Sequence, residues 1–120
     1  MITSGSLLRL DGEIFRRHIV DHFVPRVDHN QALNLARRGA VLIDVRSENE
    51  YRENGLGVNI PLPMLRLKLN RLDPAVPCLF VCDTERLSQA AAFIARQQGF
   101  DARLVKGGLH GLATLHASTN

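Results

Sequence analysis

The sequence predicts an α/β fold, a sandwich in which helices flank a mostly parallel central sheet. Short apolar runs of strand length alternate with segments whose apolar residues recur every three or four positions, the spacing of an amphipathic helix. This alternation is typical of a parallel sheet, because each helix returns the chain to the end of the sheet where the previous strand began. With 120 residues, the chain fits one domain with a single core. The strands are expected at residues 41–45, 58–62, 78–81 and 102–105.

Two helices are expected before the first of these strands. Asp11 can cap a helix over residues 11–22, where apolar side chains recur on one face. Asp28 can cap the next helix, and Gly39 supplies the left-handed residue that commonly ends one.

Three more helices follow from local signals later in the chain. Ser47 and Glu50 have the spacing of a capping box, in which each side chain satisfies a backbone N–H of the other residue. Pro63 suits the first turn of a helix. A longer helix is expected to begin at Ser88, after a polar loop, and to end at Gly99.

These elements divide the chain into three parts. The first helix precedes the alternating pattern, so we expect it to pack on the domain's own sheet, with docking on a neighbouring domain or partner protein as the alternative. The last residues are polar, which predicts a flexible tail. The expected parts are an N-terminal helical extension over residues 1–27, a domain over 28–115 and a tail over 116–120.

Composition narrows the function classes. Hydrophobic residues make up 45% of the chain and charged residues 22%, as in ordinary globular proteins. The net charge is +3, but the basic residues are scattered and accompany one Tyr and no Trp, which argues against nucleic-acid binding. The longest apolar stretches fall far short of the roughly 20 residues that cross a bilayer. We therefore expect no membrane association and a cytoplasmic location.

The chain has two cysteines, Cys78 and Cys82, which are too few for a disulfide scaffold. Their four-residue spacing within a strand points the side chains along the strand rather than toward each other, so we expect no disulfide. Cys78 begins the strand and is expected in the core. Cys82 ends the strand and opens the polar loop before the longest helix.

A cysteine in the position of Cys82 suits nucleophilic sulfur chemistry. Backbone N–H groups at a helix N-terminus point at one place and, with the helix dipole, attract an anion. The thiolate is the reactive form of cysteine, and a helix N-terminus or a cation such as Arg86 favours it. The alternative is a cysteine buried for packing alone.

Four motifs, in order along the chain, resemble the rhodanese superfamily. Residues 41–51, VLIDVRSENEY, are similar to its apolar strand followed by Asp-Val-Arg and Glu-Tyr. Residues 59–62, NIPL, are similar to its Asn-Ile-Pro element, and residues 81–88, VCDTERLS, fall where the family has its active-site loop. Residues 99–101, GFD, and 106–109, KGGL, resemble its closing glycine pattern.

The resemblance implies a three-layer rhodanese-like sandwich with sulfurtransferase activity. Cys82 would be the catalytic residue, which takes sulfane sulfur from a small anion such as thiosulfate or from a persulfide donor and passes it to a thiol acceptor. The resemblance implies no metal and no cofactor. The substrate-binding loop would consist of Asp83, Thr84, Glu85, Arg86, Leu87 and Ser88.

The resemblance also implies roles for backbone groups and for side chains around Cys82. Backbone N–H groups of residues 83–88 would stabilise the charge on the terminal sulfur. The Ser88 hydroxyl would donate another hydrogen bond, or would instead cap the following helix. Asp44 and Arg46 would support the site, although Arg46 could instead form a local ion pair with Glu50.

The loop departs from the family pattern. Glu85 stands where active members often have Gly, and Leu87 stands where they often have Arg. Asp83 and Glu85 place carboxylates near the sulfur, which would oppose a thiolate and a dianionic donor by about 1 kcal/mol each. Weak activity on thiosulfate is therefore expected. The stretch between Tyr51 and Asn59 is also shorter than in the family.

Other functions remain as alternatives. A phosphatase or arsenate reductase of this fold would need an Arg in place of Ser88 and usually a His in place of Val81, so both are disfavoured. A non-catalytic regulatory or protein-binding module of a larger protein is a second alternative, since similar domains occur fused to cyclic-nucleotide-binding sensors. His18, His22 and His29 gain no Cys or carboxylate that completes a ligand set, so no metal site is expected.

Overall fold

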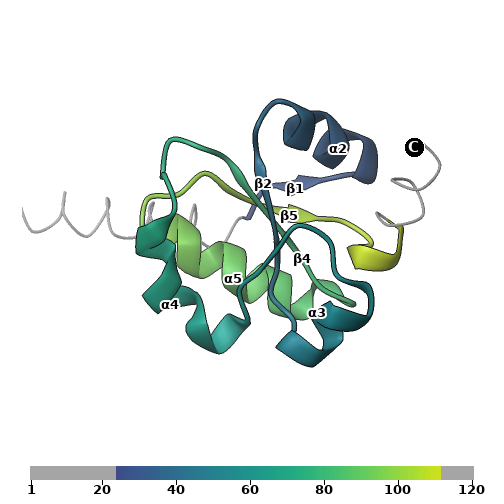
Figure 1. The fold of residues 1–120 in the computed structure, drawn as a ribbon. Coiled ribbons are helices and arrows are strands. Elements are labelled where there is room, and N and C mark those ends of the chain that lie inside the picture. The colour runs from purple at the N-terminus through teal and green to yellow at the C-terminus, as the bar shows by residue number, and fades with distance from the viewer. Residues whose placement is uncertain (1–23, 112–120) are drawn as a thin grey trace, which may run out of the picture.

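The computed structural model describes residues 24–111, and these form a three-layer α/β sandwich (Figure 1). The strands are β1 Arg26–Val27, β2 Val41–Asp44, β3 Val58–Asn59, β4 Cys78–Val81 and β5 Ala102–Val105. They form one sheet in the order β1-β5-β4-β2-β3, and every neighbouring pair is parallel. The predicted α/β class and parallel sheet are therefore confirmed.

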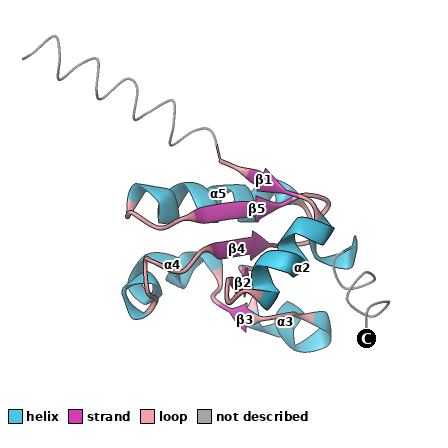
Figure 2. Cartoon of the chain, turned by 90° about the horizontal axis from the view of Figure 1, so that it is seen from above, coloured by secondary structure: helices cyan, strands magenta, loops and turns pink. Residues whose placement is uncertain are grey.

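Helices cover both faces of this sheet (Figure 2). They are α2 His29–Arg37, α3 Glu48–Asn54, α4 Leu65–Lys68 and α5 Glu85–Gln97, and short 3-10 turns, Leu62–Met64 and Leu69–Arg71, flank α4. Helix α5 packs on β4 and β5, whereas α2 lies on the opposite face. None of the helices within residues 24–111 is long and apolar enough to cross a membrane.

Strand β4 lies in the middle of the sheet and supplies apolar side chains to both faces. Successive side chains of a strand point to opposite faces, and all four residues of β4 are buried. Cys78 and Phe80 belong to the hydrophobic cluster beneath α4 and α5. Leu79 and Val81 belong to the second cluster, which includes Ala32 of α2. Cys82, the residue after β4, belongs to the same cluster as Cys78 and Phe80.

Local capping signals set the starts of α2 and α3, as predicted. The Asp28 carboxylate accepts the backbone N–H of Gln31 at 2.8 Å, and the Gln31 side chain accepts the N–H of Asp28 at 2.8 Å. Ser47 and Glu50 form the same reciprocal arrangement at the start of α3. Gly39, with φ +106°, lies in the left-handed region after α2. Each of these predictions is confirmed.

Strand β1 is an element that the sequence pattern did not predict. It pairs with β5, with Arg26 opposite Leu104 and Val27 opposite Val105. The backbone N–H of Leu104 also donates to the Pro25 carbonyl at 2.8 Å, which extends the pairing by one bond. The helix expected over residues 11–22 lies outside the described residues.

Strand β3 is shorter than the predicted run over residues 58–62. Pro61 has no backbone N–H to donate, and the next residue, Leu62, begins a 3-10 turn. Ile60 and Leu62 still donate backbone hydrogen bonds to β2 and to the residue after it, at 3.0 and 3.1 Å. The segment therefore follows β2 but leaves strand geometry two residues after it enters.

Helix α5 begins three residues earlier than the sequence predicted. We expected its start at Ser88, but it starts at Glu85, because Thr84 has extended backbone geometry and its hydroxyl accepts the N–H of Arg86 at 3.4 Å. The alternative role of Ser88 as the helix cap is therefore wrong. Only two residues separate Cys82 from the helix.

Candidate functional site

Cys82 directly follows β4 at the C-terminal edge of the sheet, the edge where open parallel sheets bind ligands. Its side chain is turned into the fold, and the residue is only 1% exposed. The N-terminus of α5, a helix of 13 residues, lies immediately beyond it. The thiol is thus held at the positive end of a helix dipole.

The first turn of α5 surrounds the sulfur of Cys82. The backbone N–H of Ser88 donates to Sγ at 3.3 Å, and Ser88 Oγ lies 3.4 Å from Sγ. The Ser88 hydroxyl also donates to the carbonyl of Glu85 at 3.2 Å, which fixes its position in the helix. The carbonyl oxygen of Thr84 contacts Sγ as well. Backbone N–H groups of residues 83–88 are expected around the sulfur. In the described part of the chain, the N–H of Ser88 is the one within hydrogen-bond distance of Sγ.

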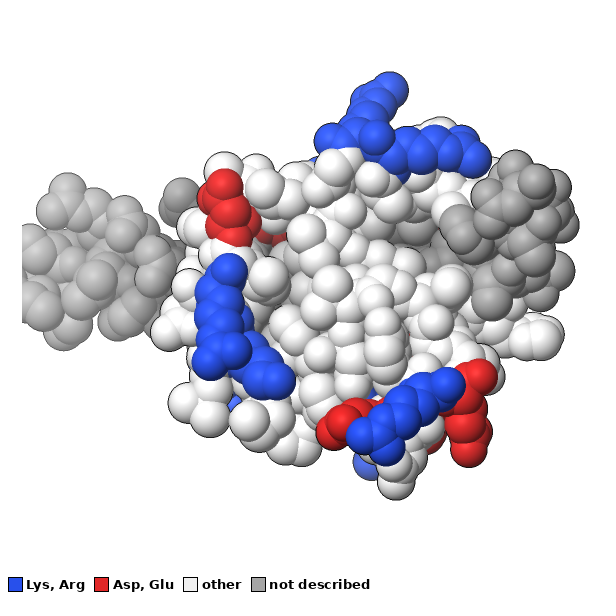
Figure 3. Space-filling model, in the orientation of Figure 1, with Lys and Arg blue, Asp and Glu red and all other residues white. Residues whose placement is uncertain are grey.

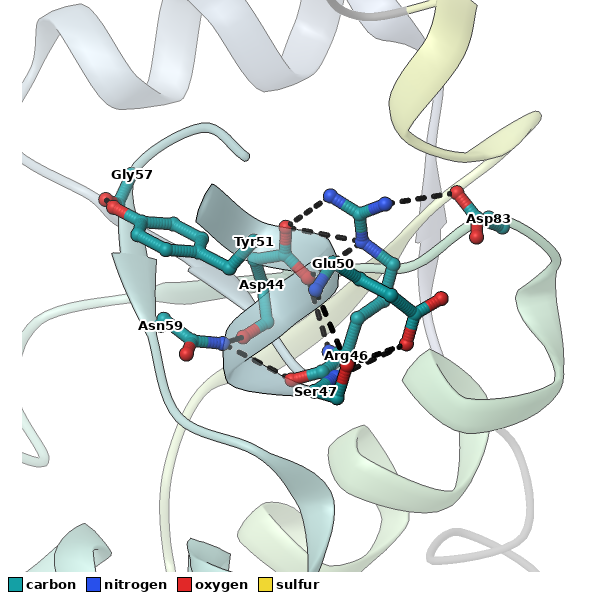
Figure 4. Close-up of polar contacts among 8 residues, drawn as sticks. All are labelled: Asp44, Arg46, Ser47, Glu50, Tyr51, Gly57, Asn59 and Asp83. Carbon is teal, nitrogen blue, oxygen red and sulfur yellow. Dashed lines mark hydrogen bonds and ion pairs between the residues drawn. The ribbon is translucent and has the colours of Figure 1, made fainter. Parts of the chain in front are cut away.

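Asp44 and Arg46 form a buried ion pair beside this loop (Figure 4). Arg46 Nε lies 3.1 and 3.2 Å from the two carboxylate oxygens of Asp44, and Nη2 lies 2.9 Å from Oδ2. The backbone N–H of Arg46 donates to the same carboxylate at 3.0 Å. Hydrogen bonding to Asp44 raises the pKa of Arg46 above its ordinary value, although burial opposes this. The Arg46 guanidinium is therefore held charged, and these bonds fix both side chains in one geometry.

Arg46 also reaches the cysteine loop, where Nη1 donates to Asp83 Oδ1 at 3.1 Å (Figure 4). The Glu50 carboxylate, the alternative partner for Arg46, binds the N–H and hydroxyl of Ser47 instead, at 3.3 and 2.9 Å. These bonds to Ser47 lower the pKa of Glu50 below its ordinary value. Arg46 thus connects the end of β2 to the residue that follows Cys82.

Asn59 is a supporting residue that the sequence analysis did not single out. Its side-chain amide donates to the backbone carbonyls of Asp44 and Arg46 at 3.0 and 3.1 Å. This contact holds the end of β2 in place from the neighbouring strand. The Asn-Ile-Pro element, in which Asn59 is the first residue, was the available signal for it.

Glu85 does not act as the sequence analysis expected. Its carboxylate forms an ion pair with Arg26 of β1 and accepts the backbone N–H of Gly107 at 3.1 Å. Asp83 is likewise paired with Arg46. The two carboxylates expected to oppose a thiolate are therefore each bound to an arginine, which offsets much of their charge. Neither Arg26 nor Gly107 carried a local signal for this role.

Arg86 and Leu87 are exposed residues of the first turn of α5. Arg86 is two positions before Ser88, which places it about 200° around the helix from the residue that contacts Sγ. It lines a shallow groove of about 350 Å³ on the outer side of α5. Leu87 is 38% exposed. Arg86 as a cation beside the thiol therefore stays a prediction that this placement does not support, and the loop lacks the arginine that the family often has at position 87.

The glycine turn after β5 packs directly on the cysteine loop. Gly107 and Gly108 have φ of +78° and +75°. A Cβ on Gly108 would lie 2.6 Å from the carbonyl oxygen of Asp83 and 2.8 Å from that of Cys82. The N–H of Leu109 donates to the Cys82 carbonyl at 3.0 Å. The turn therefore needs glycine for both its backbone geometry and its close contact with the loop.

The second cysteine, Cys78, is a core residue. It is 2% exposed, and both cysteines are free thiols. Burial raises the pKa of Cys78 from its ordinary 9.0 to about 12, and the charge of Asp101 contributes in the same direction. A thiol that stays protonated is unreactive as a nucleophile. Cys82 is therefore the better candidate for a reactive thiol.

The described residues contain no group of three or more His, Cys, Asp or Glu side chains arranged to hold a metal ion. His29 lies against the glycine turn, with Nε2 at 3.3 Å from the Gly108 carbonyl oxygen. The other two histidines considered as ligands, His18 and His22, lie outside the described residues.

Comparison with known proteins identifies relatives of this arrangement. The family model described as the rhodanese-like domain matches residues 28–114. The structure of reduced CoADR-RHD from Bacillus anthracis shares 30% sequence identity with a TM-score of 0.70. That similarity covers 83% of this chain but 19% of the other, so the chain spans less than a fifth of that protein. No curated protein matches the sequence.

Two further structures match over almost their whole length. A rhodanese homolog from Thermus thermophilus shares 28% identity with a TM-score of 0.59, over 72% of this chain and 99% of that one. The human single-domain sulfurtransferase TSTD1 shares 25% identity with a TM-score of 0.63, over 78% of this chain and 97% of that one.

Proposed function

The chain belongs to the rhodanese-like domain family, and on that premise we propose that it is a sulfurtransferase that carries sulfane sulfur on Cys82. In the first step, the Cys82 thiolate attacks the outer sulfur of thiosulfate, the S–S bond breaks, and sulfite leaves with the electron pair. In the second step, a thiolate acceptor attacks the terminal sulfur of the persulfide, and the Cys82 thiolate is released. The two steps balance without a metal or an organic cofactor.

The observation that carries this proposal is the hydrogen bond from the Ser88 N–H to Cys82 Sγ at the N-terminus of α5. A fixed backbone donor and a helix dipole stabilise negative charge on sulfur without rearrangement during the reaction. The thiolate attacks in the first step and leaves in the second, so this stabilisation applies to both. Cys78, deep in the core and with a raised pKa, supplies no competing nucleophile.

The surroundings of the loop support a donor other than thiosulfate. Thiosulfate is a dianion, and cations near the sulfur would favour it. Here Leu87 supplies none, Arg86 faces the outer side of α5, and Arg46 is already bound to two carboxylates. We therefore propose weak activity on thiosulfate and better transfer from a persulfide donor to a thiol acceptor.

Mass spectrometry after incubation with thiosulfate, and separately with a low-molecular-mass persulfide, tests the proposal. We expect a gain of one sulfur atom on Cys82 in the wild type and none in Cys82→Ser. The matched control is Cys78→Ala, which should keep the gain because its thiol takes no part. A wild-type protein that gains no sulfur from either donor would rule out the persulfide mechanism.

A second candidate function is a non-catalytic regulatory or protein-binding module of a larger protein. It is favoured by the burial of Cys82, at 1% exposure, and by the Thr84 carbonyl that lies against Sγ. The partial coverage of the Bacillus anthracis structure supports a place in a longer chain. Measured sulfur transfer to a thiol acceptor, lost in Cys82→Ser, separates the two functions.

The partners and location of the chain are part of the same proposal. On the face drawn in Figure 3, Lys and Arg side chains form separate groups around an uncharged centre rather than one continuous basic patch, which supports partners other than nucleic acid. Two free thiols suit a reducing compartment, so we place the chain in the cytoplasm.

A further inference from the structure

Two ion pairs anchor the loop over Cys82 to strands on opposite sides of β4. Asp83, directly after the cysteine, is bound by Arg46 at the end of β2. Glu85, the first residue of α5, is bound by Arg26 of β1, an edge strand on the other side of β4. Between these anchors, the Thr84 carbonyl lies against the sulfur, and Cys82 is 1% exposed. A reagent reaches this sulfur only if the loop moves.

We propose that the Arg26–Glu85 and Arg46–Asp83 pairs are latches that control access to the Cys82 thiol. Glu85 is the informative residue, because it joins three separate parts of the fold. Its carboxylate binds Arg26 and the Gly107 N–H, and Gly107 belongs to the turn that packs on the loop. Release of Glu85 frees the first turn of α5 from both neighbours at once. This role goes beyond sulfur transfer and does not depend on what the thiol carries.

The exposure of the two pairs sets the size of the effect. The side chains of Arg26 and Glu85 are 51% and 31% exposed, and that of Asp83 is 61% exposed. Ion pairs this accessible to solvent are weak, so each latch should change the open population by about two- to fivefold. The loop is therefore expected to open transiently in the wild type, and more often when a latch is removed.

Alkylation by iodoacetamide, followed separately at each cysteine by peptide mass spectrometry, tests the proposal on the full chain. Iodoacetamide is uncharged but reacts with the thiolate, so loss of a nearby carboxylate would by itself speed labelling and loss of Arg26 would by itself slow it. Cys78 reports global unfolding, because it becomes labelled only when the core opens. The variants are Glu85→Gln, Arg26→Gln, their double variant and Asp83→Asn. The control is Asp101→Asn, which removes a similarly exposed ion pair with Arg103 away from the loop.

We expect Cys82 labelling to accelerate in Glu85→Gln, in Asp83→Asn and also in Arg26→Gln, by about two- to fivefold in the first two, with Cys78 unlabelled and Asp101→Asn unchanged. A rise confined to the carboxylate variants would reflect a larger thiolate fraction and would overturn the proposal. The double variant should be no faster than its faster parent, because both changes break the same pair. Unchanged labelling in Glu85→Gln and Asp83→Asn, or an equal rise in Asp101→Asn, would overturn the proposal.

A salt titration gives a second test, which uses the wild-type protein alone and so does not depend on whether the variants fold. Salt screens exposed ion pairs, so Cys82 labelling should accelerate with added sodium chloride while Cys78 stays protected. A wild-type rate independent of salt would overturn the proposal even if the variants unfold. Because iodoacetamide reacts without a sulfur donor, failure of persulfide formation and failure of the latches give different results.

Discussion

Arg46 and Asp44 face each other through paired hydrogen bonds of 2.9–3.2 Å, and their side chains are only 4% and 0% exposed. Loss of one member of such a pair is costly, because the remaining charge stays buried away from water. Arg46 in turn carries Asp83 of the cysteine loop. The stability of the fold and the position of the loop therefore depend on the same guanidinium group.

Asp44→Asn should lower the free energy of unfolding by about 3 kcal/mol, because it removes the buried counter-charge of Arg46 and leaves only the exposed carboxylate of Asp83 as a charged partner. Urea denaturation measures this loss. Asp101→Asn, which removes an exposed partner of Arg103, should cost less than about 1 kcal/mol. Equal losses in the two variants would contradict a special role for burial.

Gly108→Ala should destabilise the protein more than Gly99→Ala. Both glycines have positive φ, +75° and +90°, so an alanine costs about 1 kcal/mol or more at either position. Only at Gly108 would the new Cβ also meet the loop backbone, 2.6 Å from the Asp83 oxygen, whereas nothing lies within 4 Å of a Cβ on Gly99. The excess should be about 1–3 kcal/mol in urea denaturation, as for overpacked sites. Similar losses would show that the turn can move away from the loop.

Those parts of the structure that depend on neighbours in the sequence could be predicted. Strands β4 and β5 match the predicted ranges, because each is a short apolar run with clear boundaries. The starts at Asp28 and Ser47 were correct because a capping box joins residues only three positions apart. The place of Cys82 at the end of a central strand followed from the same local signals.

The parts that depend on distant residues could not be predicted. Strand β1 has two residues, and it exists because it pairs with β5 near the other end of the chain. The direction of Glu85 depends on Arg26, which is 59 positions away. Loop composition alone therefore suggested carboxylates facing the sulfur, whereas the fold supplies each with an arginine. The earlier start of α5 differs in kind, since it depends on a local signal, the Thr84 side chain that caps the helix.

Cys78 should make the folded state less stable as the pH rises above 9. Its thiol has a pKa of about 12 in the folded protein and 9.0 ordinarily, so between these values the unfolded chain holds fewer protons than the folded one. The stabilising contribution is complete below pH 9 and is lost by about 1.4 kcal/mol per pH unit above it.

Denaturation of the wild type and of Cys78→Ala between pH 8 and about 11 measures this dependence. The cavity in the alanine variant lowers its stability by an amount that does not change with pH. All other titrating groups are the same in both proteins, so their effects cancel in the comparison. The difference between the two proteins should therefore shrink as the pH rises. A constant difference would mean that the buried thiol ionises in the folded state as readily as in the unfolded chain.

Leu87→Arg should increase the rate of sulfur transfer from thiosulfate. Leu87 is 38% exposed on the first turn of α5, beside Ser88, so a longer side chain can enter solvent without disturbing the core. One added positive charge near a dianion, screened by water, should improve kcat/KM by about 1 kcal/mol, or roughly fivefold. Formation of thiocyanate, with cyanide as the sulfur acceptor, measures the rate. Leu87→Gln, which adds polarity without charge, is the matched control and should show no gain.

The salt dependence of that gain identifies its cause. An electrostatic effect at an exposed position should fade when sodium chloride shortens the screening distance, and it should be small for a donor without net charge. A gain that persists at high salt, or that appears equally in Leu87→Gln, would mean that Leu87 limits the reaction by its shape and not by the charge it fails to supply.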